Sequence, residues 1–433
     1  MPSLEKPAVQ VRCQQHSPSF TVIQHSHVFL MNANASPLPP RRIANRLAAW
    51  PRLGVVLLAV LAFRLALNVP ALVGVNAIPN VGGVPPGLPY DFKSFPGVWA
   101  RWDSGHYLTI VRQGYVRDME RAFMPLYPLL IVALGFGSTA LALWSGLLIS
   151  LAAFLGALAI LWRQVRDDYG EAVATTTLIA LNLFPTSFYF SALYTESVFL
   201  LLFALTVWLS RRHKFLLAAF CVGLAALTRI NGIVLGIIPV IELLQSVPLK
   251  TAWRSPKLWV TLIEIGLISI IGVITLILYF KATLNLPFAF IEQQRILMHR
   301  TPNWPWVSLL DEIRMVLFGY GGFEANKFMR AIGVLDLSAL LLFIALTVQS
   351  FRRVRLSLAV YCAASLVVIL SSHGPGTMGA YASSRYMLQL FPCFVVMALA
   401  LVQRTPLRRI TWVGSAALLV VLTAWFASGH WVA

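Results

Sequence analysis

The chain has 433 residues, of which 58% are hydrophobic and only 12% are charged, and its formal net charge is +18 at pH 7. A soluble domain carries about a quarter charged residues, so this composition excludes an ordinary soluble protein. Recurring apolar runs and a mean hydropathy of +0.75 indicate a polytopic membrane protein instead. In such a protein, Lys and Arg gather in cytoplasmic loops, so the positive charge does not predict a nucleic-acid partner.

The N-terminal segment 1–45 is polar and mixed, which predicts a disordered cytoplasmic tail without a cleavable signal peptide. The first apolar run, 53–76, follows a group of basic residues, Arg41, Arg42, Arg46 and Arg52. Basic residues before a first span place the N-terminus in the cytoplasm. The polar connection 77–122 is then expected on the non-cytoplasmic side of the membrane.

Ten further apolar runs lie at 141–161, 173–191, 193–210, 215–230, 231–247, 258–280, 331–349, 356–371, 385–402 and 409–427. Basic residues gather in alternating connections between them: Arg163 and Arg166; Arg211, Arg212 and Lys214; Lys250, Arg254 and Lys257; Arg352, Arg353 and Arg355; Arg404, Arg408 and Arg409. This alternation requires that the short run 123–138, which contains Pro125 and Pro128, enters the membrane without crossing it. We therefore predict an all-α membrane domain over 46–433 with about eleven transmembrane helices.

The most informative polar stretch, Arg101 to Leu108, lies in the outer connection 77–122. Asp103 and His106 are three residues apart, which places them on one face of a helix. A carboxylate at the membrane edge suits a general base that deprotonates an acceptor hydroxyl during glycosyl transfer. The alternative is that Asp103 only caps a helix beginning at Ser104 or Gly105.

His106 fits three roles: a ligand of the same acceptor, an orienting partner of Asp103, or a structural histidine. Asp103 and His106 alone are a weak metal signal, and no cluster has zinc-ligand spacing. We expect no cofactor, although a divalent metal held by Asp103 and Glu196 remains open.

Two further charged residues stand in apolar surroundings. Glu196, which follows Tyr194 in a predicted helical corner on the outer side, is either a helix N-terminal charge or a second active-site carboxylate. Arg229 precedes a predicted helix break at Asn231-Gly232. A buried arginine is costly unless it pairs, so it binds either Glu196 or a phosphate.

Three more arginines are candidate phosphate ligands on the outer side. Arg295 and Arg300 precede Trp304 and Trp306, and Arg385 precedes Tyr386 at the start of a span. Guanidinium groups beside aromatic rings suit a sugar phosphate. The alternative for all three is an interfacial cation whose side chain extends to the membrane surface.

These motifs, taken in order, resemble the GPI mannosyltransferase II family of the GT-C superfamily, which adds the second mannose of the glycosylphosphatidylinositol anchor. The matching residues are Trp102-Asp103-Ser104, His106-Tyr107-Leu108, Gly114-Tyr115, Ala122-Phe123, Pro125-Leu126-Tyr127-Pro128, Phe184-Pro185-Thr186-Ser187, Tyr194-Thr195-Glu196-Ser197, Thr228-Arg229, Asn231-Gly232, the region Gln294 to Arg300 with Pro302, Arg385-Tyr386 and Phe391-Pro392. Met124 departs from the family pattern, which has a second aromatic residue there.

The resemblance implies a helical membrane enzyme that moves mannose, with inversion, from a polyprenyl (dolichyl-type) phosphate donor to a lipid-linked acceptor, giving an α-1,6 product. It implies an active site on the non-cytoplasmic side, in the endoplasmic reticulum of a eukaryote or the plasma membrane of a bacterium. The catalytic residues expected are Asp103 and His106. The substrate-binding residues expected are Trp102, Tyr107, Tyr127, Tyr194, Glu196, Arg229, Arg295, Arg300, Arg385 and Tyr386.

Two other functions compete with this interpretation. A transporter or flippase of lipid-linked sugars would carry internal repeats and interrupted helices at the membrane midplane. The sequence shows no clear repeat, and its polar residues gather in outer loops. A non-catalytic membrane scaffold would tolerate the loss of Asp103.

Overall fold

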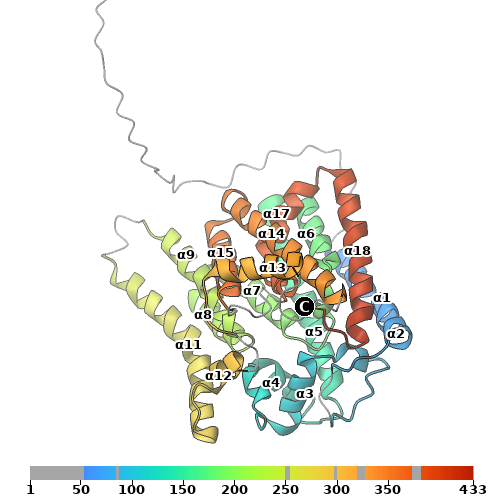
Figure 1. The fold of residues 1–433 in the computed structure, drawn as a ribbon. Coiled ribbons are helices and arrows are strands. Elements are labelled where there is room, and N and C mark those ends of the chain that lie inside the picture. Colours follow the sequence, from blue (N-terminus) through green and yellow to red (C-terminus); the bar gives the residue numbers. More distant parts are fainter. Residues whose placement is uncertain are drawn as a thin grey trace, which may run out of the picture. The chain divides into compact units, whose positions relative to one another are not determined.

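A computed structural model of the chain describes residues 53–83, 87–248, 254–296, 300–318, 327–372 and 382–432. The predicted tail 1–45 and the basic residues Arg41, Arg42, Arg46, Arg52 and Lys250 lie outside these ranges. Every regular element within them is a helix, which confirms the predicted all-α class (Figure 1).

The first half of the chain contains the predicted outer connection and the helices that precede it, lie within it and follow it. They are α1 (Leu53–Ala66), α2 (Asn68–Ala77), η1 (Gly97–Trp99), α3 (Asp103–Gln113), η2 (Met119–Ala122), α4 (Leu126–Leu134), α5 (Ala142–Tyr169), α6 (Glu171–Leu183), η3 (Ser187–Phe190), α7 (Glu196–Ser210) and α8 (Phe215–Ala226).

The second half begins with a short distorted helix and ends with a long apolar one. Its elements are η4 (Ile230–Gly236), α9 (Ile237–Ser246), α11 (Pro256–Leu284), α12 (Ala289–Ile296), α13 (Pro305–Phe318), α14 (Lys327–Arg353), α15 (Leu356–Leu370), α16 (Ser383–Tyr386), η5 (Met387–Gln389), α17 (Phe391–Leu401) and α18 (Thr405–Ala427).

Several of these helices are long and apolar enough to cross a bilayer, as expected of a multi-pass membrane protein. Five pass on length and composition, and the pair 383–389 and 391–401, bent by 87°, makes a sixth if it is one span. Five shorter apolar helices of 10–17 residues lie at the remaining predicted runs. A span perpendicular to the membrane needs about 20 residues, so the count of eleven full spans is not confirmed.

The run 123–138 contains the nine-residue helix α4. At 1.5 Å per residue this helix is about 14 Å long, whereas the hydrocarbon core is about 30 Å thick. Its length therefore agrees with the prediction of a segment that enters the membrane without crossing.

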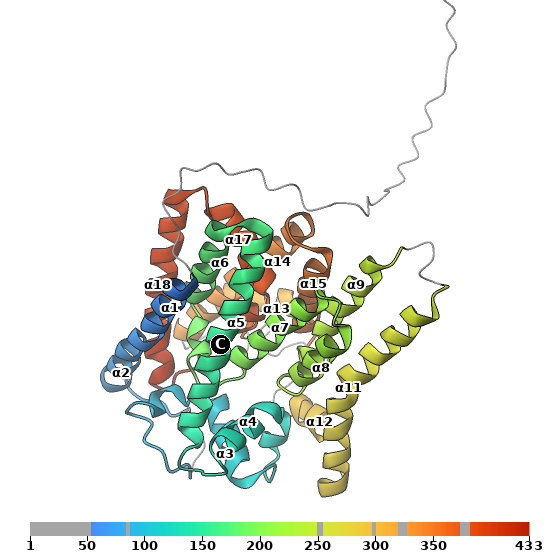
Figure 2. The same cartoon turned by 180° about the vertical axis from the view of Figure 1, so that it is seen from behind.

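The helices pack against one another in a bundle. Within the bundle α7 contacts both α5 and α8, α8 contacts α11, and α2 contacts α18. Helices α3 and α4 contact each other and lie together at one end of the longer helices in both views (Figures 1 and 2). The polar stretch that begins α3 therefore faces the ends of the apolar helices.

Candidate active site

Asp103 is the first residue of α3, and the chain before it is held firmly. Trp102 has φ 52°, a backbone conformation uncommon for a residue with a side chain. Its N–H donates to the Gly83 carbonyl oxygen at 2.5 Å. The Ser104 hydroxyl donates to the Leu193 carbonyl oxygen at 3.0 Å. The second bond ties the start of α3 to the segment that leads into α7. Asp103 is the first helical residue and Trp102 is the N-cap, so Asp103 is not the capping residue of α3.

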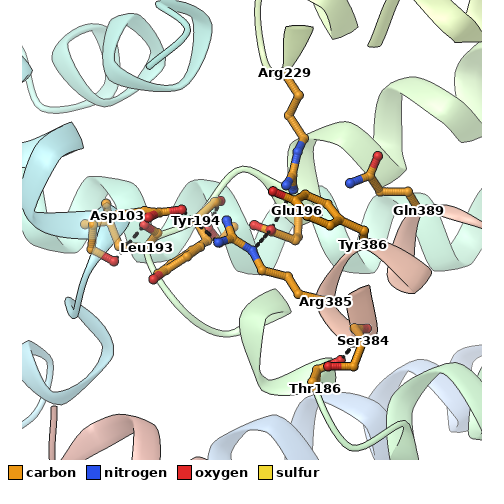
Figure 3. A network of polar contacts seen from close by, with 12 residues as sticks. Asp103, Thr186, Leu193, Tyr194, Glu196, Arg229, Ser384, Arg385, Tyr386 and Gln389 are labelled. Carbon is orange, nitrogen blue, oxygen red and sulfur yellow. Dashed lines mark hydrogen bonds and ion pairs between the residues drawn. The ribbon is translucent and has the colours of Figure 1, made fainter. Parts of the chain in front are cut away.

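Arg385 joins two carboxylates from different helices (Figure 3). Its Nη1 atom lies 2.8 Å from Asp103 Oδ2, and its Nε atom donates to Glu196 Oε1 at 2.5 Å. Arg229 Nη1 donates to the same Glu196 oxygen at 2.6 Å. We call these four residues the Asp103 network.

The Asp103 network contains two cations and two anions, so its formal charge is zero. Such balance is needed because an unpaired charge is costly in a low-dielectric interior. The Glu196 and Arg385 side chains are 1% and 6% exposed, whereas that of Asp103 is 19% exposed. Asp103 is therefore the member that an incoming molecule reaches most easily.

Aromatic rings surround Arg385. The centre of its guanidinium group lies 4.8 Å from the Tyr189 ring centroid and 4.6 Å from that of Tyr194, within the range of a cation–π contact. The Tyr194 hydroxyl donates to the Arg101 carbonyl oxygen at 3.0 Å. Arg101 in turn donates to the Phe92 carbonyl oxygen at 2.6 Å, and burial lowers the pKa of Arg101 to about 10. Arg101 therefore remains a cation at neutral pH, and it holds the connection before α3, which contacts Tyr194.

Tyr386 contacts arginines from two other segments, Arg229 and Arg300. Its ring lies 5.2 Å from the Arg229 guanidinium centre, and its hydroxyl accepts a hydrogen bond from Arg300. Arg300 therefore contacts Tyr386, which lies beside the Asp103 network, and its predicted role as a phosphate ligand stays a prediction. Arg295 is an exposed residue of α12, and no contact with the network is recorded for it among the described residues.

Residues 90–307 match the family model described as mannosyltransferase (PIG-V). The chain belongs to this mannosyltransferase family. Membership confirms the predicted family and its enzyme class. The chain is also 30% identical over 138 residues to GPI mannosyltransferase 2 of Schizosaccharomyces pombe (strain 972 / ATCC 24843), and this alignment covers 31% of the chain and 30% of that relative. The matched range of the PIG-V family includes Asp103, Glu196 and Arg229, whereas Arg385 lies beyond it and joins them only through the fold.

Three other predicted site residues of this PIG-V family member form contacts within the protein itself. Tyr127 is fully buried, and its hydroxyl donates to the Gly146 carbonyl oxygen at 2.8 Å. Tyr107 packs edge-on against the Tyr127 ring, and burial raises the pKa of Tyr107. Trp102 donates through Nε1 to the His430 carbonyl oxygen at 3.2 Å. A substrate-binding role for these aromatic residues stays a prediction.

His106 has a partner that the sequence analysis did not consider. Its Nδ1 atom lies 3.2 Å from Glu120 Oε1, whereas the Asp103 carboxylate is paired with Arg385. Glu120 lies in a charged stretch, Arg117 to Arg121, which resembles a solvated surface. Nothing local in the sequence marks it as buried.

Asp336, which was not predicted as a site residue, positions the segment carrying Arg385. Asp336 is 1% exposed, and its Oδ1 atom accepts a hydrogen bond from the Ser384 N–H at 2.8 Å. The Thr186 hydroxyl donates to the Ser384 carbonyl oxygen at 2.9 Å. A signal existed: Asp336 is the only acidic residue in the apolar run 331–349, and a carboxylate in such a run is a site candidate.

We expect Asp336→Leu to destabilise the protein by about 1–3 kcal/mol, because the buried Ser384 N–H loses its acceptor. Asp336→Asn keeps a carbonyl oxygen at this place and should remain close to wild type. Thermal unfolding in detergent measures the difference. Equal stability of the Leu and Asn variants would show that the hydrogen bond to Ser384 is not needed.

A metal centre built from side chains was also considered. Among the residues that the structure describes, no group of three or more His, Cys, Asp or Glu side chains is arranged to hold a metal ion.

Proposed function

We propose that this protein transfers mannose from a polyprenyl phosphate mannose donor to a hydroxyl group of a membrane glycolipid. The observation that carries the proposal is the pairing of Asp103, the most exposed acid of the network, with the buried Arg385. Membership of the PIG-V mannosyltransferase family supports mannose as the transferred sugar. A multi-pass membrane protein meets both lipid-linked substrates within one bilayer.

In this proposal the arginines bind the donor phosphate. Arg385 and Arg229 share one Glu196 oxygen, so both guanidinium groups face a single small region. A phosphate placed there forms charge-assisted hydrogen bonds and competes with Asp103 for Arg385. The competition releases the Asp103 carboxylate beside the donor.

The proposed reaction is a single displacement with inversion. The acceptor oxygen attacks the anomeric carbon of the donor mannose, and its proton passes to the Asp103 carboxylate. The bond from the anomeric carbon to the phosphate oxygen breaks, and the electron pair leaves with polyprenyl phosphate. Arg385 and Arg229 balance the charge that develops on this phosphate, so the proposal includes no metal cofactor.

The proposal also covers the side of the membrane on which the site lies and the glycosidic linkage that is formed. The basic connections between apolar runs support a non-cytoplasmic location for the loop that contains Asp103. The 30% identity to a GPI mannosyltransferase 2 supports an α-1,6 linkage to a mannose-bearing glycolipid acceptor.

The purified protein, mixed with a membrane lipid extract, should transfer radiolabelled mannose from polyprenyl phosphate mannose and not from GDP-mannose. The reason is that Arg385 and Arg229 face one small region, which suits the single phosphate of polyprenyl phosphate mannose, and that a polyprenyl chain lies in the same bilayer as the protein. Thin-layer chromatography of the lipid products measures transfer, and digestion with an α-1,6-mannosidase checks the linkage.

A matched control for this assay is Asp168→Asn. Asp168 also forms an ion pair with an arginine, Arg211, at 2.6 Å. It lies near the C-terminal end of α5, whereas α5 contacts Tyr194, beside the Asp103 network, through Ser150. The two positions are about 27 Å apart along the helix. This variant should transfer as wild type does. Transfer from GDP-mannose, or no transfer from either donor, would contradict the proposed function.

A further inference from the structure

The pair formed by His106 and Glu120 is not used by the reaction proposed above. Glu120 is 1% exposed, and its Oε1 atom lies 3.2 Å from His106 Nδ1. Its second oxygen, Oε2, is buried without a hydrogen-bond partner in the described part of the chain. A carboxylate buried in this way is costly, so we looked for a function that it serves.

The imidazole ring of His106 is held in one orientation. It stacks on the Phe123 ring, with centroids 4.8 Å apart and planes 19° from parallel. The Phe123 N–H donates to the Glu120 carbonyl oxygen at 3.0 Å, and the Tyr115 hydroxyl donates to the Phe123 carbonyl oxygen at 3.1 Å. The stacking partner and the carboxylate therefore belong to one fixed segment, and both constrain His106.

The hydrogen-bonding role of each His106 nitrogen depends on the tautomer, and an accepting partner at Nδ1 favours one of the two. An ionised carboxylate only accepts hydrogen bonds, so the hydrogen of a neutral imidazole lies on Nδ1, toward Glu120. The lone pair then lies on Nε2, which can accept a hydrogen bond from a group such as a hydroxyl. The His106 side chain is 22% exposed, so an incoming molecule can reach part of the ring.

The imidazole ring of His106 lies on the same helix as Asp103. Both residues lie in α3, three positions apart, and such residues are neighbours on a helix surface with Cβ atoms about 5–6 Å apart. Both side chains are partly exposed, at 22% and 19%. A sugar ring carries several hydroxyl groups, so one ring can reach both side chains at once.

We propose that His106, oriented by Glu120, accepts a hydrogen bond from a second hydroxyl of the acceptor sugar, beside the hydroxyl that Asp103 deprotonates. His106 is then a binding residue that selects the acceptor, and Glu120 is a positioning residue that acts through His106. This inference rests on the proposed function, because it assigns a role in binding the acceptor of that reaction.

The test compares the kinetics of His106→Ala, Glu120→Ala and the double variant. The assay uses polyprenyl phosphate mannose as donor and a membrane lipid extract as acceptor. Loss of one hydrogen bond should raise the apparent KM for the acceptor lipid about fivefold to tenfold in each single variant. The KM for the donor should stay unchanged.

The double variant tests whether Glu120 acts through His106. Residues that act through one interaction are not additive, so the double variant should be no worse than His106→Ala alone. Glu120→Gln keeps an acceptor oxygen toward Nδ1 and should restore the wild-type KM for the acceptor. Asp168→Ala, which breaks the Arg211 pair, serves as the control and should leave both KM values unchanged.

Three results would overturn the inference while leaving the proposed function intact: additive losses in the double variant, an equal rise in the KM for the donor, or no rescue by Glu120→Gln. If Glu120→Ala fails to fold, the comparison of His106→Ala with Glu120→Gln decides the question. An inactive wild-type protein would remove the proposed function and this inference together.

Discussion

Replacing Asp103 with Asn is expected to lower kcat for mannosyl transfer about a hundredfold or more. Asparagine keeps the size of the side chain and a carbonyl oxygen facing Arg385, but it cannot take the acceptor proton. Arg385 retains Glu196 as an ionic partner at 2.5 Å, so the fold should survive the change. Initial rates at saturating donor and acceptor, at matched protein concentration, measure the effect.

The interpretation of this variant depends on its control and on its stability. Asp168→Asn removes a carboxylate that also pairs with an arginine, and it should keep the wild-type rate. Thermal unfolding should show that Asp103→Asn remains folded. Unchanged transfer by Asp103→Asn would exclude Asp103 as the base and make Glu196 the next carboxylate to test.

The second large effect concerns stability rather than rate. Glu196→Ala should destabilise the protein by about 3–5 kcal/mol, because it removes one partner from a buried ion-pair network. Both Arg385 and Arg229 bind the same Glu196 oxygen, so the change leaves two guanidinium groups short of a counter-charge. Unfolding followed by intrinsic fluorescence in detergent, with yield after size exclusion, measures the loss.

A more exposed ion pair provides the comparison for Glu196. The Asp168 and Arg211 side chains are 23% and 21% exposed, and partly exposed pairs contribute about 1 kcal/mol or less. Asp168→Ala should therefore lower stability much less than Glu196→Ala. Similar losses for the two variants would show that Glu196 does not hold the network together.

Much of the site was visible in the sequence as separate residues. Asp103, Glu196, Arg229 and Arg385 each stand out because a charged side chain is rare in a chain with 12% charged residues. The pairing of Arg229 with Glu196 was one of two expected alternatives, since a buried arginine is costly unless it pairs. The spacing of Asp103 and His106 predicted that both lie on one helix, and both are residues of α3.

The residues that support the site were harder to predict. Glu120 looks like part of a solvated charged stretch, and only the folded structure shows that its side chain is buried. Asp336 acts on the Ser384 backbone 48 positions away. Its residue type indicates a site, but nothing in the sequence indicates which atom it binds.

The sequence by itself determined the helical class, the membrane environment and the family, because these depend on local composition and on motifs in fixed order. Only the tertiary structure decided which charges meet. Arg385 and Glu196 are 189 residues apart, and their contact depends on how α7 and α16 pack. A buried charge must find an opposite charge, but sequence separation does not say which one, because the partner is chosen by the packing of distant helices.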